Sequence, residues 1–337
     1  MNIAHLLPYT ARFPLTKHNG RYEWVLRLAT LQAAAGHAVT IYAAPGSHAD
    51  TTNIQWASHG GDLGDPKTNN LANIRAAFTN TAHDIYHSHF DFLHYSLAGT
   101  TPKPIVCTQH WFPNEALVNA SRSSKSHNVT LVPVTHYMAD ADTALGLTPS
   151  AVIYHGIDLE LFSYDARPKT ERFVFVGRIT PSKGVREAVA LAKLCNIPLD
   201  IIGKINSTDK DYWNSFLPSV DGMQIRYLGA KTQTEVVAHL ATARAMLFPL
   251  QVKEAFGQTT VEAQACGTPV IIQDLGASKE LVQSGKTGFV VSTTDQYVEA
   301  IKNIDSIKPA DCRAFAEKFN VRTMASAYDD LYEHLIK

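Results

Sequence analysis

The sequence has few cysteines and no long apolar run. Its four cysteines stand far apart among 337 residues and form no Cys-x-x-Cys pair, so a disulfide framework is excluded and a reducing compartment is expected. No stretch approaches about 18 consecutive apolar residues, which excludes a transmembrane helix, and a proline and an arginine interrupt the N-terminal segment MNIAHLLPYTARF where a signal peptide would be apolar. We therefore expect a cytoplasmic protein, with peripheral contact at the inner face of the membrane left open.

An excess of charge of either sign is also lacking. The chain carries 30 lysines and arginines against 31 aspartates and glutamates, whereas a protein that holds long nucleic acids needs a basic excess. A nucleic-acid partner is therefore not expected. A hydrophobic content of 45% and a length beyond the roughly 250 to 300 residues at which single cores divide predict a globular protein of two domains.

Short apolar runs alternate with segments of helical spacing along the chain. A first run at Asn2–Leu7 is followed by a predicted helix at Arg21–Ala35, which Gly36 ends, and by a β-branched run at Ala38–Ala43. This alternation is typical of parallel sheets covered by helices. The further predicted strands are Asp84–His87, Pro104–Cys107, Thr130–Val134, Arg172–Val176, Leu199–Ile202, Gln224–Tyr227, Ala245–Phe248, Thr268–Ile272 and Phe289–Val291.

The pattern lapses into a polar, proline-containing stretch at 155–171, which divides the chain. We predict an α/β fold of two facing Rossmann-like, doubly wound domains, with an N-terminal domain at 1–154, a linker at 155–171 and a C-terminal domain at 172–310. Residues 311–337 have helical spacing and are expected to close the fold as one helix or a pair of helices, packing back toward the N-terminal domain.

Histidines follow the strands of the N-terminal domain. His87, His89 and His110 come at or just after strand ends, and in open α/β sheets these carboxyl ends face the ligand crevice. His87 and His89 share one face of a strand, a spacing that some metal sites use, but two histidines are only half a site. We expect no metal there and favour crevice lining or contact with an acceptor. Trp111, directly after His110, is an aromatic side chain suited to stacking on a sugar or a planar acceptor.

Two glutamates flank a glycine in the segment Glu254-Ala-Phe-Gly-Gln-Thr-Thr-Val-Glu262. The backbone N–H groups of Gly257, Gln258 and Thr259 would stand free at a helix N-terminus, which is a site for an anion such as phosphate. In one continuous helix the two carboxylates would be separated by about 12 Å of axial rise, more than the roughly 5 to 9.5 Å of paired glycosidase acids. We interpret them as contacts to two parts of one extended ligand, such as a nucleotide sugar.

A second motif, Val176-Gly177-Arg178-Ile-Thr-Pro-Ser-Lys183-Gly184, presents two cations between a strand and a helix. An arginine grips phosphate oxygens in a bidentate fork and a lysine acts as a point charge. Arg178 and Lys183 would therefore stabilise a departing diphosphate. From this motif alone, two solvated surface cations are the alternative.

Together the two motifs resemble the retaining glycosyltransferases of family 4, which have the GT-B fold of two Rossmann domains. Tyr154-His-Gly-Ile-Asp158 with Phe162 is similar to the linker of that family, and Gly276-Ala-Ser-Lys-Glu280 with Gly285-x-x-Gly288-Phe is similar to its distal loop. The resemblance covers nearly the whole chain. In finer detail the chain looks most like the branch that includes UDP-glucose-dependent pterin glucosyltransferases.

The resemblance implies a role for each matching residue. Arg178 and Lys183 would bind the diphosphate of the sugar donor. Glu254 would bind the transferred sugar and Glu262 the ribose, while His110 would lie beside the donor sugar and the acceptor. The further donor-binding residues by this resemblance are Asn19, Gly20, Gly177, Phe256, Gly257, Gln258 and Thr259, and the acceptor candidates are His87, His89 and Trp111. The chain departs from the family at two of these positions, since Asn19-Gly20 stands where the family has Gly-Gly, and Trp111 stands where it has glycine.

The implied reaction is a retaining transfer of a hexose, with UDP-glucose as the first expected donor and GDP-mannose as the second. The acceptor hydroxyl would attack the face that the nucleotide leaves, through an oxocarbenium-like state, and the leaving phosphate can take its proton. Arg178 and Lys183 would neutralise the diphosphate, so we expect a metal-independent reaction without a cofactor. The oligomeric state stays open, as does the acceptor, which can be a small molecule, a glycan or a lipid-linked sugar.

Other functions are weighed against this one. A nucleotide-sugar 2-epimerase on the same fold would release free nucleotide without an acceptor, but the paired glutamates and the Lys-Gly loop argue against it. The intact set of Arg178, Lys183, Glu254 and Glu262 argues against a non-catalytic nucleotide-sugar binder. A dinucleotide-dependent dehydrogenase would need a Gly-x-Gly-x-x-Gly segment after the first strand, which the chain lacks.

Overall fold

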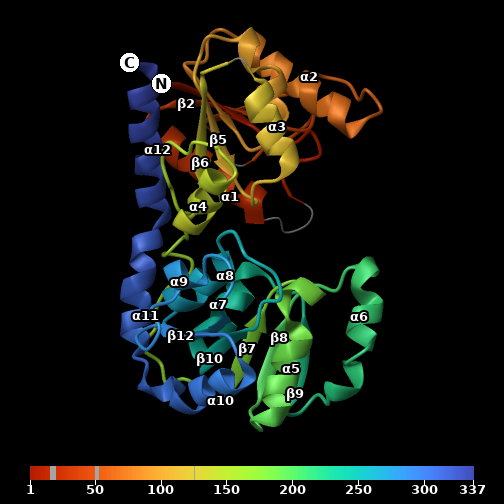
Figure 1. Ribbon diagram of the computed structural model, residues 1–337, viewed down its shortest axis with the longest axis vertical. Helices are drawn as coiled ribbons and strands as arrows, with labels where there is room; N and C mark the ends of the chain where they lie inside the picture. Colours follow the sequence, from red (N-terminus) through yellow and green to blue (C-terminus); the bar gives the residue numbers. More distant parts are fainter. Residues whose placement is uncertain (16–19, 50–52, 125) are drawn as a thin grey trace. The chain divides into compact units, whose positions relative to one another are not determined.

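Two parallel β-sheets organise the computed structural model, which describes residues 1–15, 20–49, 53–124 and 126–337 (Figure 1). Each sheet has six strands, in the order β3-β2-β1-β4-β5-β6 in the first and β12-β11-β10-β7-β8-β9 in the second. The predicted α/β fold with two doubly wound parallel sheets is therefore confirmed. The strand order reverses between β1 and β4 and between β7 and β10, and sheets of this kind bind ligands at such a reversal. The strands are β1 Asn2–Leu6, β2 Ala38–Tyr42, β3 Ile54–Ala57, β4 Ile85–Ser88, β5 Ile105–Gln109, β6 Val129–Pro133, β7 Phe173–Val176, β8 Leu199–Ile202, β9 Ile225–Gly229, β10 Ala245–Phe248, β11 Val270–Gln273 and β12 Gly288–Val291.

The chain divides into two compact units, one around each sheet. Unit 1 consists of Met1–Gly156 together with Val321–Lys337, and unit 2 consists of Ile157–Asn320. The helices of unit 1 are α1 Gly20–Ala34, α2 Pro66–Thr79, α3 Glu115–Ser123, α4 His136–Ala144 and α12 Val321–Ile336. Those of unit 2 are α5 Val185–Leu194, α6 Lys210–Asn214, α7 Gln233–Thr242, α8 Gln258–Ala265, α9 Ser278–Leu281, α10 Thr294–Asn303 and α11 Pro309–Ala316.

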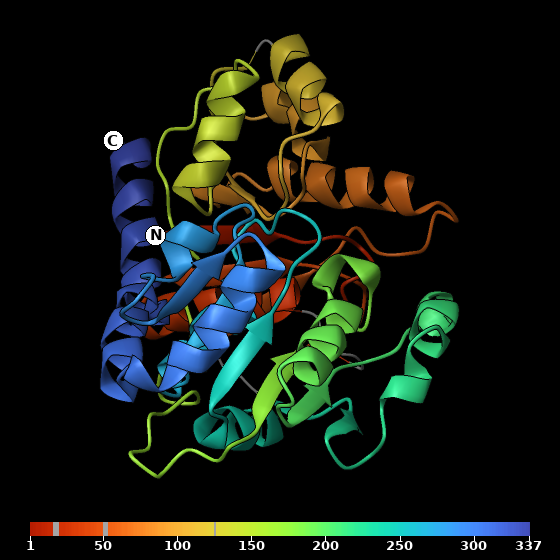
Figure 2. The same ribbon diagram turned by 60° about the horizontal axis from the view of Figure 1, so that its bottom comes forward.

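Local chemistry sets where several of these helices begin. Asp65 accepts a hydrogen bond from the backbone N–H of Thr68 at the start of α2. Thr232 before α7 and Thr293 before α10 form capping boxes, each with a side chain three residues further on. In unit 2, α5 and α10 contact one another and lie side by side against the sheet (Figures 1 and 2).

The predicted strands correspond to observed strands within one or two residues at each end, and the helix predicted at Arg21–Ala35 is α1. One strand, β3, has no counterpart among the predictions. Its sequence Ile54-Gln-Trp-Ala is four residues long and lies at the edge of the sheet, where it pairs with β2 alone. A short edge strand contributes no continuous apolar run, so hydrophobic patterning does not reveal it.

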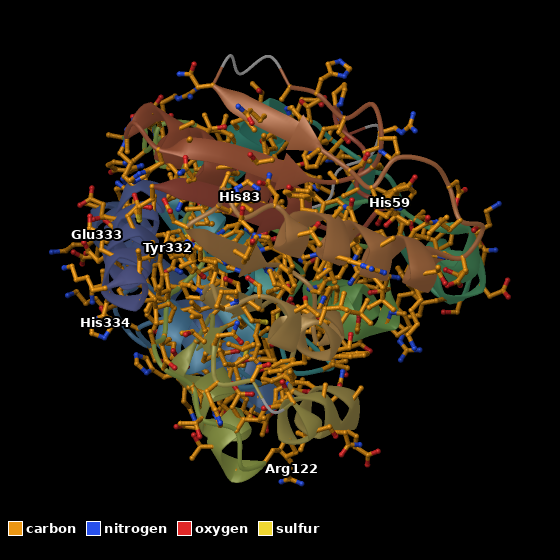
Figure 3. All side chains as sticks on the ribbon, turned by 90° about the horizontal axis from the view of Figure 1, so that it is seen from above. His59, His83, Arg122, Tyr332, Glu333 and His334 are labelled. Atoms are coloured by element: carbon orange, nitrogen blue, oxygen red, sulfur yellow. The ribbon has the colours of Figure 1, made fainter. Side chains whose placement is uncertain are left out.

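One face of the unit 1 sheet packs against α1 and α12. Ile3 and Val106 from the sheet share a buried cluster with Trp24 of α1 and with Tyr328 and Tyr332 of α12. The buried positions of α12 recur at intervals of three and four residues, which places them on one helical face. Tyr332 lies on the side of α12 toward the sheet, while the neighbouring Glu333 and His334 point away from it and are exposed (Figure 3).

The helical segment expected at 311–337 forms two helices, which is one of the two arrangements expected. The first, α11, belongs to unit 2, where Arg313 donates hydrogen bonds to the backbone oxygens of Phe162 and Ala265 at 3.0 and 3.2 Å. The second, α12, belongs to unit 1, as the core contacts of Tyr328 show. A pair forms instead of a single helix because Asn320 has an extended backbone and separates the two helices.

Candidate functional site

The loop after β7 carries the predicted cations of unit 2. Gly184 ends this loop in the left-handed region, with φ of 76°, and a Cβ atom there would lie 1.8 Å from the backbone oxygen of Pro249. Only glycine fits both the conformation and the close approach. Gly184 therefore lets the loop 177–184 contact the loop 249–257, and these two segments are called the donor loops below.

Lys183 and Glu254, one from each donor loop, form an ion pair between Lys183 Nζ and Glu254 Oε2. Their side chains are 16% and 25% exposed, and the ammonium group also lies 5.6 Å from the centre of the Phe248 ring. A half-buried pair is screened by solvent less than a surface pair. The structure thus brings into contact two residues of separate sequence motifs, 71 positions apart.

Glu254 is held in place by a glycine of the predicted distal loop. Gly276 has φ of 62°, and a Cβ atom there would lie 2.5 Å from the backbone oxygen of Glu254. The same oxygen accepts a hydrogen bond from the N–H of Ala277 at 3.3 Å. The turn after β11 therefore supports the backbone of Glu254 directly.

The start of α8 has the features of an anion site. Gly257 precedes the helix with φ of 80°, and among the described residues no side-chain hydrogen bond caps the first turn. The leading N–H groups of a helix, here those of Gln258 and Thr259, have no partner within the helix and favour negative charge. A Cβ atom on Gly257 would lie 3.3 Å from Cγ of Glu254, so the ion pair stands beside this helix start.

The two glutamates of the motif lie on different elements. Glu262 is in the second turn of α8, one turn after Gln258, whereas Glu254 is in the loop before the helix. The spacing calculated for one continuous helix therefore does not apply, because α8 begins only at Gln258. Phe256 between them is buried and packs edge-to-face against Phe319 with ring centres 5.7 Å apart, which anchors the loop.

Arg178 is exposed and makes no ion pair within the described parts of the chain. Its neighbour Gly177 donates a backbone hydrogen bond to Ile202 at 3.0 Å. Sequence reasoning missed Gly203, where a Cβ atom would lie 1.8 Å from the backbone oxygen of Gly177, and whose N–H donates to Gly229 at 3.0 Å. A glycine directly after each of two neighbouring predicted strands was the signal that could have identified these positions.

The predicted residues of unit 1 are placed as follows. Gly20 is the first residue of α1, and Asn19 lies outside the described residues. Trp111 is 56% exposed, so an acceptor can reach it. His87 and His89 have no exposed surface, which corrects the expectation that they line the mouth of a crevice. Their rings are buried because α1 and α12 cover that face of the sheet.

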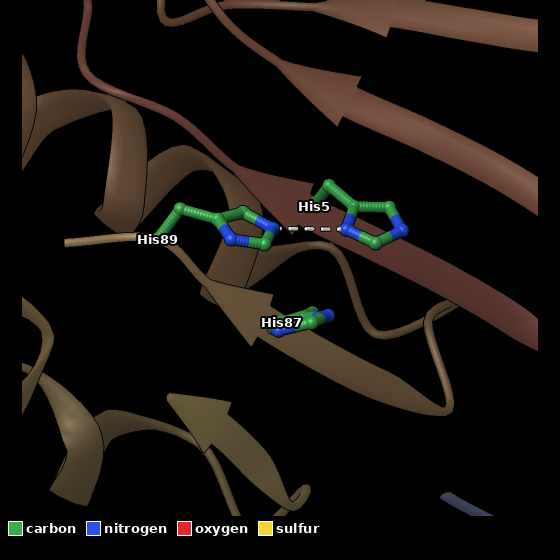
Figure 4. A group of neighbouring side chains, drawn as sticks. All are labelled: His5, His87 and His89. Carbon is green, nitrogen blue, oxygen red and sulfur yellow. Dashed lines mark hydrogen bonds between the residues drawn. The ribbon is translucent and has the colours of Figure 1, made fainter. Parts of the chain in front are cut away.

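Buried histidines from four segments meet on this face. Figure 4 shows three of them, His5, His87 and His89. His5 of β1 pairs in register with His87 of β4, and His89 lies on the same side two residues later. His5 Nδ1 lies 3.1 Å from His89 Nε2, and His89 Nδ1 lies 3.2 Å from His110 Nε2. His110 Nδ1 in turn lies 3.2 Å from His155 Nε2. His5 was not predicted, although a histidine inside an otherwise apolar strand was a visible signal.

Burial is the main cause that lowers the pKa of each of these imidazoles. The pKa falls to about 4 for His5 and to about 3 for His155. For His89 and His110 it falls well below the ordinary value, with smaller contributions from neighbouring imidazoles and from the Arg21 guanidinium. All four rings are therefore neutral at physiological pH.

One nitrogen each of His5, His87 and His89 lie within 4.8 Å of one another, a spacing that prompts the question of a metal ion. Both nitrogens of every ring already have a hydrogen-bonding partner. His5 contacts His89 and Gln32, and His89 contacts His5 and His110. His87 contacts Thr108 Oγ1 at 2.7 Å and the hydroxyl of Tyr332. Hydrogen bonding among neutral rings accounts for this arrangement in full, and an ion would have to displace several of these contacts.

Two segments of the chain match known protein families. Residues 23–161 match the family described as Glycosyltransferase Family 4, and residues 157–319 match the family described as Glycosyl transferases group 1. The chain belongs to the glycosyltransferases of the family 4 type. The donor loops and α8 all lie within the second matched segment.

Curated relatives of this glycosyltransferase cover part of its length. It is 29% identical over 177 residues to a D-inositol 3-phosphate glycosyltransferase of Mycobacterium marinum (strain ATCC BAA-535 / M), covering 45% of this chain and 36% of the relative. It is 30% identical over 224 residues to a glycogen synthase of Mycobacterium tuberculosis (strain CDC 1551 / Oshkosh), covering 60% of this chain and 53% of the relative. The chain thus spans between about a third and about half of the length of these relatives.

Solved structures show the same fold. The crystal structure of Anabaena Alr3699/HepE in complex with UDP superposes with a TM-score of 0.76 at 16% sequence identity, covering 99% of this chain and 100% of that one. The GT-B fold expected from the sequence is therefore confirmed. Within the described residues of the glycosyltransferase, no helix combines the length and apolar character needed to cross a lipid bilayer.

Two Asp-x-Asp segments bear on the expectation that this glycosyltransferase needs no metal. In Asp140-Ala-Asp142, the second carboxylate is buried, accepts a hydrogen bond from Gln109 Nε2 at 2.9 Å, and has a pKa raised by burial to about 6. In Asp209-Lys-Asp211, the first carboxylate accepts a hydrogen bond from Asn206 Nδ2 at 3.2 Å. Neither segment is part of the donor loops, and metal independence stays a prediction.

Proposed function

We propose that the chain is a retaining glycosyltransferase that moves a hexose from a nucleotide diphosphate sugar to an acceptor hydroxyl. UDP-glucose is the first donor and GDP-mannose the second. The observation that carries the proposal is the ion pair of Lys183 and Glu254 beside the uncapped start of α8. Cation, carboxylate and free N–H groups stand within one short region, as a ligand with both phosphates and sugar hydroxyls requires.

Each group of this region has a distinct task in the proposal. Lys183 and the exposed Arg178 bind the diphosphate, together with the N–H groups at the start of α8. Glu254 accepts hydrogen bonds from hydroxyls of the transferred sugar, and its partner Lys183 holds the carboxylate in a fixed position. Glu262, one turn into α8, accepts hydrogen bonds from the ribose.

Catalysis then consists of positioning and of charge stabilisation on the leaving group. As the bond between the sugar and the nucleotide diphosphate breaks, negative charge develops on the phosphate, and Lys183 and Arg178 stabilise this charge. The acceptor hydroxyl attacks from the same face and passes its proton to the leaving phosphate, so no protein nucleophile is required. The cations of the chain serve in this scheme without a metal ion.

The choice of a uridine nucleotide draws support from the relatives. The Anabaena Alr3699/HepE structures include complexes with UDP and with UDP-glucose. For the acceptor, Trp111 is the exposed aromatic candidate in unit 1. His87 and His89 support the buried histidine network in this proposal, since neither has surface to offer an acceptor.

Thermal unfolding with UDP, GDP, ADP, UDP-glucose and GDP-mannose, each with and without a chelator, tests the proposal. A ligand at 100 times its Kd stabilises the folded state by about 2.7 kcal/mol. We expect uridine nucleotides to raise the midpoint and the chelator to change nothing. A midpoint that no nucleotide moves contradicts the proposal, and a shift that the chelator abolishes contradicts metal independence.

Variants separate the roles of the two glutamates. Glu262→Ala should weaken binding of free nucleotide, whereas Glu254→Ala should reduce sugar transfer and leave binding of free nucleotide nearly intact. Lys183→Ala should reduce the transfer rate, with Lys231→Ala as the matched control because Lys231 forms an exposed ion pair with Glu235. Equal losses of nucleotide affinity in the two glutamate variants would refute the assignment.

A further inference from the structure

The buried histidines of unit 1 form a chain whose hydrogen bonds have one direction. The direction starts at Asp329 of α12, whose carboxylate can only accept. Gln32 of α1 donates from Nε2 to Asp329 Oδ1 at 2.9 Å, so its other amide atom, Oε1, faces His5. Oε1 lies 2.8 Å from His5 Nε2 and accepts a hydrogen bond from it. His5 therefore carries its proton on Nε2, and its Nδ1 is left as an acceptor.

The same reasoning passes from ring to ring. His89 Nε2 must carry a proton in order to donate to His5 Nδ1 at 3.1 Å, which leaves His89 Nδ1 bare. His110 Nε2 then donates to His89 Nδ1, and His155 Nε2 donates to His110 Nδ1, both at 3.2 Å. A neutral imidazole has one donor and one acceptor nitrogen, so the hydrogen bond to each ring determines its tautomer. All four rings carry the proton on Nε2.

The surroundings keep these rings neutral and in place. Burial lowers the pKa of each ring, and the Arg21 guanidinium adds to the effect at His89 and His110. Trp24 of α1 packs along the row, with ring centres 5.7 Å from His89, 5.2 Å from His110 and 4.9 Å from His155. The chain of rings is thus a fixed part of the unit 1 core.

We propose that Asp329 and Gln32 act through His5 and His89 as positioning residues that hold His110 in the Nε2–H tautomer. This inference rests on the proposed function together with the family resemblance, by which His110 would lie beside the donor sugar and the acceptor. His110 Nε2 donates to His89, and His110 Nδ1 accepts from His155 Nε2 at 3.2 Å. A substrate hydroxyl that takes the place of His155 would therefore donate to Nδ1, because in this tautomer His110 accepts a hydrogen bond there and has no proton to give.

The tautomer can be measured without substrate by ¹⁵N NMR of protein labelled at histidine. The nitrogen shifts distinguish a protonated from a bare nitrogen, and a His110→Gln variant assigns the His110 signals. We expect protonated Nε2 and bare Nδ1 at His5, His89, His110 and His155. A protonated Nδ1 or an imidazolium at His110 in the unsubstituted protein overturns the proposal. So does a change of the His5 and His89 signals when zinc is added or a chelator removes a bound ion.

Gln32→Met tests the coupling, because it keeps the volume of the side chain and removes the acceptor of His5. The His110 signals should then show a mixture of both tautomers. Gln32→Glu is the conservative variant, since a carboxylate at this position still accepts from His5 Nε2. It should restore the single tautomer when combined with Asp329→Asn, which removes the repulsion between two carboxylates. An unchanged His110 spectrum in Gln32→Met overturns the proposal.

His94 is an internal control for these spectra. It is buried and contacts Ser88 Oγ at 3.0 Å, and it is not part of the chain of four rings. Its signals should stay the same in Gln32→Met. If they move together with those of His110, the substitution has disturbed the whole core, and the loss of the tautomer does not count in favour of the proposal; the spectrum of the unsubstituted protein then decides.

Activity supplies the second readout. Gln32→Met should lower kcat about tenfold or more and change the pH profile, while the nucleotide-dependent rise of the unfolding midpoint stays as in the unsubstituted protein. An unchanged kcat and pH profile overturn the positioning role. The proposed function and the tautomer proposal can be refuted independently. The absence of a nucleotide effect on unfolding of the unsubstituted protein refutes the proposed function, whereas the NMR spectra test the tautomer without any ligand.

Discussion

Replacing Gly184 by alanine tests how the two donor loops are held together. Gly184 has φ of 76°, and its added Cβ atom would lie 1.8 Å from the backbone oxygen of Pro249. The left-handed conformation alone costs an alanine about 1 to 2 kcal/mol. The clash adds about 1 to 3 kcal/mol, because a backbone oxygen cannot move aside by changing a rotamer. We expect the free energy of unfolding to fall by about 2 to 5 kcal/mol.

Gly222→Ala is the matched control in the same unit. Gly222 has φ of 75°, and its added Cβ atom would meet no atom of the described residues within 4 Å. Only the conformational cost of about 1 to 2 kcal/mol applies there. The difference between the two variants therefore isolates the contact between Gly184 and Pro249.

Thermal and denaturant unfolding of both variants, followed by titration with UDP, measures the effect. For a unit of this size, 1 kcal/mol corresponds to about 2 to 4 °C in Tm. Gly184→Ala should lower the Tm clearly more than Gly222→Ala and should also weaken the response to UDP, because Lys183 is the adjacent residue. Equal losses of stability in the two variants would show that the close approach does not matter.

Three further outcomes follow from single side chains. Asp200→Asn should lower the free energy of unfolding by about 2 kcal/mol at neutral pH, less than for a fully buried pair because Arg226 is partly exposed. Burial opposes ionisation of Asp200, but hydrogen bonds from Arg226 and Arg172 leave its pKa lowered. The contribution of Asp200 should therefore be lost as the pH falls below the ordinary carboxyl pKa of about 3.9, which pH-dependent unfolding of both proteins measures. Thr232→Ala should cost about 1 kcal/mol in denaturant unfolding, because it removes the capping box of α7, and a loss below the error of the measurement would contradict this. Tyr297→Phe should leave stability unchanged or raise it by up to about 1 kcal/mol, since the buried hydroxyl has no partner among the described residues, and a clear loss of stability would reveal a hydrogen bond that the structure does not contain.

Most of the strands could be predicted from the local hydrophobic pattern. Runs such as Ala245–Phe248 are short, apolar and bounded by helical segments, so their own residues are enough to indicate a strand. The edge strand Ile54–Ala57 was missed because only its pairing with β2 defines it. Whether 311–337 forms one helix or two stayed open, because the apolar spacing continues across Asn320. Which unit each half joins depends on contacts far away in the sequence.

The residues of the donor loops could be predicted from the sequence, but the contact between the two loops could not. Lys183 and Glu254 belong to separate sequence motifs, and their ion pair depends on the close approach that Gly184 allows. The histidine chain was less accessible still. Its members His5 and His155 lie 150 positions apart, and each looks locally like one polar residue in a strand or a loop. Only the register of β1 with β4 reveals that His5 belongs beside His87.

The return of α12 to unit 1 affects how the chain folds during synthesis. Unit 2 is a continuous insertion, Ile157–Asn320, within a unit whose core needs Tyr328 and Tyr332. The ribosome adds about 5 to 20 residues per second, and domains usually fold in the order in which they emerge. Here the later unit is complete first, while α1 alone covers one face of the sheet that begins at Asn2 until α12 arrives. We expect nascent unit 1 to expose the apolar surface that Tyr328 and Tyr332 later cover, and therefore to need more protection from aggregation than unit 2.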